Sequence, residues 1–139
     1  MSIYSKTRET LNKQGAKIIA SIGNEVTRSQ VFLDLIGEQI DLADSLYNKK
    51  MNRDDIGQQM TSISNAIATA VEAEEDSAGK KVFSNDLKRK IENTARLSND
   101  TAYQSLLKQY DIATMDIDDY TRCLSLYGDL ISFVKHSGR

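Results

Sequence analysis

The sequence contains no proline and no tryptophan, and it has one cysteine and one histidine among its 139 residues. Absence of proline is typical of long helices, because proline interrupts helix interiors but is common in turns and at sheet edges. The one cysteine, Cys123, cannot form a disulfide within the chain. The one histidine, His136, lies three residues from the end of the sequence, a position that argues against a histidine-based triad, and one histidine cannot form a histidine-rich metal site.

Long apolar runs are also missing. No stretch approaches the roughly 18 apolar residues that a membrane-spanning helix needs, and the opening segment, residues 1–6, lacks the apolar core of a signal peptide. These absences predict a cytoplasmic protein with no membrane partner. Charged residues make up 27% of the chain with a net charge of -2, whereas general phosphate-binding domains are strongly basic.

What the sequence does contain is helical periodicity. Apolar residues recur at the spacing of an α-helix, and the breaks between these segments carry residues typical of helix caps. We predict helices over residues 5–21, 28–48 and 53–76, then two short helices or one kinked helix between Ser84 and Asp116, and a last helix that ends at Gly138. The predicted caps are Thr27, Asn52, Ser84, either Ser98 or Asp100, and Asp116. Residues 1–139 are therefore predicted to form one all-α domain, a compact bundle of five to six helices.

Two of the predicted helices are apolar over an unusually wide arc. In the second helix and the last helix, apolar residues cover roughly half of the circumference, at about 100° per residue. A surface helix usually shows a narrower apolar stripe. The second and last helices are therefore predicted to be central in the bundle, with Cys123 buried on the apolar side of the last one. Each also has an interior glycine, Gly37 and Gly128, which would permit close helix approach.

Four acidic residues are the best candidates for a metal site. Glu38 and Asp41 share one helix face and Glu72 and Glu75 share another, so antiparallel packing of those helices would bring the four together. Such a cluster could hold Mg²⁺. The arrangement is similar to the acidic pairs of all-α nucleotide pyrophosphohydrolases, but the two pairs occur in the reverse order. A Mg-dependent nucleotide hydrolase is therefore one alternative, and a solvated acidic face is the simpler interpretation.

Basic residues concentrate in one stretch. Lys88, Arg89, Lys90 and Arg96 fall on the predicted fourth helix, where they could contact phosphates. No aromatic residues are interleaved with them, as a single-strand stacking platform would require. This patch gives a second alternative, a small accessory subunit of a nucleic-acid-binding complex. The simpler interpretation is again a solvated face.

Because no catalytic motif emerges, the favoured hypothesis is a non-enzymatic interaction or assembly module with no cofactor. Tyrosine and phenylalanine are enriched in interfaces, and the last helix has more apolar surface than a small monomer easily covers. We therefore predict a protein partner, favouring a second copy of the chain. The residues expected to carry this contact are Tyr120, Tyr127 and Phe133.

Overall fold

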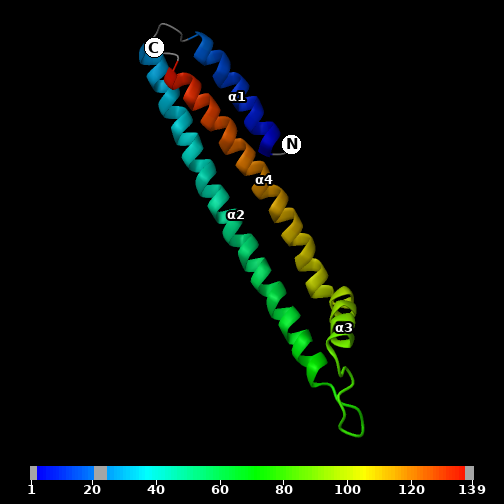
Figure 1. Cartoon of the computed structure of the whole chain (residues 1–139). Coiled ribbons are helices and arrows are strands. Elements are labelled where there is room, and N and C mark those ends of the chain that lie inside the picture. The colour runs from blue at the N-terminus through cyan, green and yellow to red at the C-terminus, as the bar shows by residue number, and fades with distance from the viewer. Residues whose placement is uncertain (1–2, 21–24, 137–139) are drawn as a thin grey trace. The chain divides into compact units, whose positions relative to one another are not determined.

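The computed structural model describes residues 3–20 and 25–136, and these residues form four α-helices (Figure 1). Their bounds are α1 Ile3–Ala20, α2 Glu25–Ala73, α3 Asp86–Asn99 and α4 Thr101–His136. The only β pairing within the described ranges is an isolated bridge between Glu75 and Lys81. The all-α prediction is confirmed, but the structure has four helices where five to six were predicted.

The error in the helix number comes from two predicted breaks that do not exist. Residues 28–48 and 53–76 were predicted as separate helices, yet α2 runs without interruption from Glu25 to Ala73. The predicted start of the last helix at Asp116 likewise falls inside α4. Asparagine and aspartate cost only about 0.7 kcal/mol relative to alanine inside a helix. Without proline to interrupt the backbone, that cost is too small to end a helix.

Several caps also differ from those predicted. Thr27 lies within α2, which begins at Glu25, and Asn85 instead of Ser84 caps α3. The Asn85 side-chain oxygen accepts a hydrogen bond from the backbone N–H of Lys88 at 2.9 Å. Asp100 does cap α4 as predicted, accepting from the backbone N–H of Tyr103 at 2.8 Å. The predicted end at Gly138 and the break near Gly23 lie outside the described residues.

The chain forms two compact packing units, and both long helices contribute to each. The α1 unit contains residues 1–50 and 115–139, and the α3 unit contains residues 51–114. Within the α1 unit, α2 and α4 run antiparallel, as the Tyr127–Glu38 and Lys49–Asp116 contacts show (Figure 1). Within the α3 unit, the same antiparallel order places Gly57 against Tyr110.

The core of the α1 unit lies between α2 and α4. Val31 and Leu35 of α2 pack with Tyr127 and Val134 of α4, and Leu11 of α1 packs against this cluster. Cys123 is fully buried as predicted, with its thiol 3.9 Å from the backbone oxygen of Ile3. The α3 unit has a smaller core, in which Ile56, Val71 and Ala113 are buried.

A structured turn joins α2 to α3. The Asp76 side chain accepts hydrogen bonds from the backbone N–H groups of Ala78 and Lys80, each at 2.9 Å. Gly79 adopts a φ of 78°, a left-handed conformation that glycine takes without steric cost. These local bonds bring Glu75 beside Lys81 and direct the chain back toward α3.

Replacing Asn85 with alanine should destabilise the protein by about 1 kcal/mol, because it removes the side-chain cap of α3. The loss can be measured by urea denaturation followed by circular dichroism. Asn99→Ala is the matched control, since Asn99 is exposed at the other end of α3 and caps nothing. Equal losses in the two variants would contradict the capping role of Asn85.

Candidate interaction surfaces

The structure does not gather the three predicted partner-binding residues on one surface. Tyr127 is only 4% exposed, and its hydroxyl donates a hydrogen bond to Glu38 Oε2 at 2.7 Å. Burial, and secondarily this bond to Glu38, raises the pKa of Tyr127. Tyr120 is half-buried, with Lys49 Nζ 4.9 Å from its ring centroid. Phe133 alone is largely exposed, so Tyr127 is part of the core and not of an open surface.

The two acidic pairs are not brought together. Convergence would require Glu38 and Asp41 to lie on one helix and Glu72 and Glu75 on a second, antiparallel helix. In the structure α2 carries the first three, and Glu75 follows its last turn, so a single continuous helix replaces the expected pair. Glu38 and Asp41 belong to the α1 unit, whereas Glu72 and Glu75 belong to the α3 unit. Among the described residues there is no group of three or more acidic, histidine or cysteine side chains that could hold a metal ion.

Two of the four predicted phosphate-binding residues have carboxylate partners. Arg96 pairs with Glu74 at 2.5 Å and with Glu92 at 2.8 Å, and hydrogen bonds to Glu92 and Glu74 raise the pKa of its guanidinium. Arg89 pairs with Asp86 and also donates to the backbone oxygen of Phe83 at 3.2 Å. Lys88 and Lys90 are exposed. The patch therefore presents two lysines to solvent, with both arginines facing carboxylates.

The most prominent surface feature of the α1 unit is an exposed apolar stripe on α2. It was not predicted from the sequence. It consists of four side chains, each more than half exposed and each seven residues from the next: Val26, Leu33, Ile40 and Tyr47. At 3.6 residues per turn they stay within an arc of about 60°. We call them the α2 stripe. Ile40 and Tyr47 belong to the wide apolar arc of the predicted second helix, and their seven-residue spacing is the signal that indicates a coiled-coil seam.

Gly37 leaves an opening in the α2 stripe. It is exposed, and a Cβ atom built on it would meet no neighbouring atom within 4 Å. Leu33, Ile36, Gly37 and Ile40 occupy positions i, i+3, i+4 and i+7, which is the set that forms a hole for a partner's side chain in coiled coils. Close approach between helices was one interpretation of Gly37 and simple tolerance of a glycine was the other, and among the described residues no helix of the same chain approaches it closely. Gly128 has only an ordinary contact, 3.9 Å from Gln39 Nε2.

Acidic residues line one edge of the α2 stripe. Asp34, Asp41 and Asp44 are all exposed, and helical geometry places them on the same side of the stripe. Asp34 accepts a hydrogen bond from Gln30 on the same helix at 2.9 Å. Among the described residues none of these three carboxylates forms an ion pair. The stripe therefore combines an apolar centre with a negative edge.

A second exposed apolar surface lies on α3. Leu87 and Ile91 are each more than 60% exposed, and Ala95 continues the same line four residues later. No residue of α3 is buried, and the side turned toward the rest of the α3 unit carries Arg89, Glu92, Asn93 and Arg96. This helix thus turns its charged side inward and its apolar side outward. We call Leu87, Ile91 and Ala95 the α3 face.

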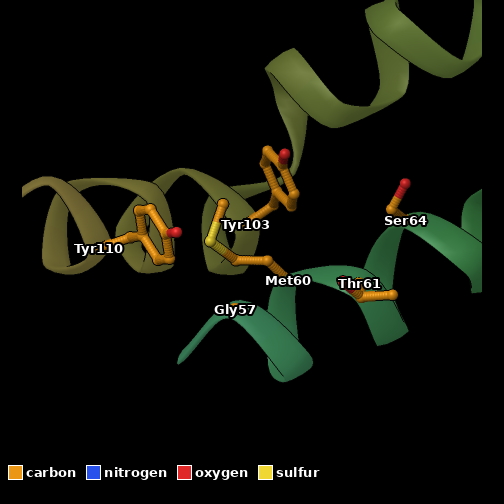
Figure 2. Close-up of a pocket in the computed structure, with 6 residues that line it drawn as sticks. All are labelled: Gly57, Met60, Thr61, Ser64, Tyr103 and Tyr110. Atoms are coloured by element: carbon orange, nitrogen blue, oxygen red, sulfur yellow. The ribbon is translucent and has the colours of Figure 1, made fainter. Parts of the chain in front are cut away.

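A pocket of the α3 unit lies between α2 and α4. Tyr103 and Tyr110 of α4 face Gly57, Met60, Thr61 and Ser64 of α2, and Met60 extends toward the two rings in Figure 2. Tyr110 lies 3.5 Å from the position a Cβ on Gly57 would take, so this glycine allows close approach. Arg53 approaches the Tyr110 ring at 6.0 Å. The titratable side chains of this lining are the two tyrosines, and no carboxylate, histidine or thiol lies beside them in it.

Two further results bear on function. None of the helices in the described ranges combines the length and the apolar character needed to cross a membrane. Comparison of the chain with protein-family models, with curated proteins and with solved structures finds no match. The α2 stripe and the α3 face are therefore the features that bear on function.

Proposed function

We propose that this chain is a non-enzymatic interaction module of the cytoplasm that assembles with further copies of itself through the α2 stripe. The observation that carries the proposal is the exposure of four large apolar side chains at intervals of seven residues. Contiguous exposed apolar surface marks sites of protein association, and a seven-residue period is the pattern by which helices pair along a seam.

The size of the stripe fits association better than chance exposure. Burying one leucine or isoleucine gains about 1.5–3 kcal/mol, whereas association costs about 4–15 kcal/mol of translational and rotational freedom. One exposed residue would not overcome that cost. The α2 stripe offers four such residues, with Ile36 and Ala43 beside them. The free energy gained by burying them together exceeds the lower end of the association cost.

The C-terminal helix has a smaller role in this proposal than the sequence suggested. Phe133 remains an exposed residue that a partner could cover, but Tyr127 supports the core and Tyr120 packs beneath Lys49. The nucleic-acid and metal-dependent alternatives receive no support from the geometry of the described residues, since both arginines face carboxylates and the acidic pairs are apart.

The test is the mass of the protein in solution. The wild type should form complexes larger than one 15.6 kDa chain as its concentration rises, measured by sedimentation velocity. The double variant Leu33→Asp, Ile40→Asp should stay at the mass of one chain, because both side chains are exposed and the substitution spares the core. Its circular dichroism spectrum should match that of the wild type.

Two further variants sharpen the result. Ser125→Asp is the matched control, since Ser125 is an exposed polar residue of α4 in the same unit, and this variant should assemble like the wild type. Phe133→Asp measures what the C-terminal helix adds. A wild type that stays at the mass of one chain at every concentration would overturn the proposal.

A further inference from the structure

We propose that the α2 stripe of one copy binds the α3 face of a second copy, an inference that rests on the proposed self-association and names its partner surface. The contact joins two different surfaces of the same chain. It is therefore either made twice in a reciprocal dimer or repeated from copy to copy.

The first argument is the orientation of α3. A helix that packs against its own unit normally turns its apolar side inward. Here the inward side carries Arg96, which pairs with Glu74 and Glu92, while Leu87 and Ile91 point to solvent. The pair with Glu74 ties this charged side of α3 to the turn that follows α2, and the apolar side stays free for another surface.

The second argument is charge. The α2 stripe has a negative edge formed by Asp34, Asp41 and Asp44. The α3 face is bordered by Lys88 on one side and Lys90 on the other, and both are exposed. Docking the α3 face places two lysines beside the negative edge, whereas the α2 stripe itself has one exposed lysine, Lys50, on its other edge near Tyr47. Complementary charge at the rim of an interface favours one orientation and disfavours others.

The third argument is shape. The hole formed by Leu33, Ile36, Gly37 and Ile40 has open space above Gly37, and coiled-coil pairing fills such a hole with one large apolar side chain. Ile91 lies at the centre of the α3 face, with Leu87 and Ala95 one turn away on either side. Ile91 is thus the side chain that we assign to the hole.

Mixing two single variants tests this pairing by sedimentation velocity. Ile40→Asp damages the α2 stripe and Ile91→Asp damages the α3 face, and both residues are exposed. Each variant alone should associate at least tenfold more weakly than the wild type. A 1:1 mixture should regain a species of two chains, because one intact α2 stripe then meets one intact α3 face.

Gly37→Leu provides a variant whose fold is not at risk. A Cβ atom at this position would meet no neighbouring atom within 4 Å, and leucine is a better helix former than glycine, so helix content should be kept or raised. The leucine would fill the hole, and association should weaken at least tenfold. Wild-type association by Gly37→Leu would overturn the assignment of Ile91 to the hole.

The outcomes separate this inference from the proposed function. One outcome is that the wild type and Ile91→Asp assemble equally well and that the 1:1 mixture gains no further association. Two α2 stripes would then pair with each other, so the proposed function would stand and this inference would fail. If the wild type remains a single chain, both fail. If only the mixture and the wild type assemble, the pairing of stripe with face is supported.

Discussion

Replacing Leu35 with alanine should lower the free energy of unfolding by roughly 2–5 kcal/mol, the largest loss expected from a single truncation in this chain. The Leu35 side chain has no exposed surface and packs in the cluster of Val31, Tyr127 and Val134. Truncation removes buried apolar atoms and leaves a cavity between α2 and α4. Since small domains are stable by about 5–15 kcal/mol, urea denaturation should detect the change readily.

Leu33→Ala is the matched control for this experiment. Leu33 lies two residues away on the same helix and is 61% exposed, so its truncation should change the free energy of unfolding of the single chain by no more than about 0.5 kcal/mol. The comparison is made at a concentration below that of self-association. Equal losses from Leu33→Ala and Leu35→Ala would show that the inward and outward sides of α2 are assigned incorrectly.

Tyr127 should make stability depend on pH above the ordinary tyrosine pKa of about 10. Burial and the bond to Glu38 raise the pKa of Tyr127 in the folded chain. Below about pH 10 both the folded and the unfolded chains keep the phenol proton. Above it the unfolded chain loses the proton while the folded chain retains it, so the folded state loses stability as pH rises.

The variant Tyr127→Phe isolates this effect. The difference in unfolding free energy between wild type and Tyr127→Phe should fall by about 1 kcal/mol between roughly pH 10 and 11, because only the wild type has this proton. All other side chains are common to both proteins and cancel in the difference. Tyr47→Phe, which changes an exposed tyrosine, should keep the wild-type profile. A difference that does not change with pH would contradict the raised pKa.

The periodicity of the sequence was enough to predict the helical class, and the absence of proline supported it. It did not predict the helix boundaries, because the same residues that cap helices are tolerated inside them. Asp116 illustrates the point: it resembles a cap in the sequence, yet in the structure it lies in the middle of α4 and pairs with Lys49 at 3.4 Å. Lys49 is 67 positions away in the sequence, so a local sequence pattern cannot predict this pair.

The candidate site was harder to predict than the fold. A helical period shows which residues share a side of a helix, but not whether that side faces the chain or the solvent. Leu87, Ile91 and Ala95 have the spacing of one side of a helix, and in the structure that side faces outward. Arg96, on the opposite side of α3, pairs with Glu74 in the turn that follows α2, and only the tertiary structure reveals this contact.

The antiparallel course of α2 and α4 has a consequence for the entropy of forming the native contacts. The pair between Arg96 and Glu74, near the turn, closes 22 residues, whereas Lys49–Asp116 closes 67, Tyr127–Glu38 closes 89 and Cys123–Ile3 closes 120. Loop-closure entropy grows with the number of residues enclosed. Arg96–Glu74 therefore closes at the lowest entropic cost of the four, and within the α1 unit Lys49–Asp116 closes at a lower cost than Tyr127–Glu38 or Cys123–Ile3.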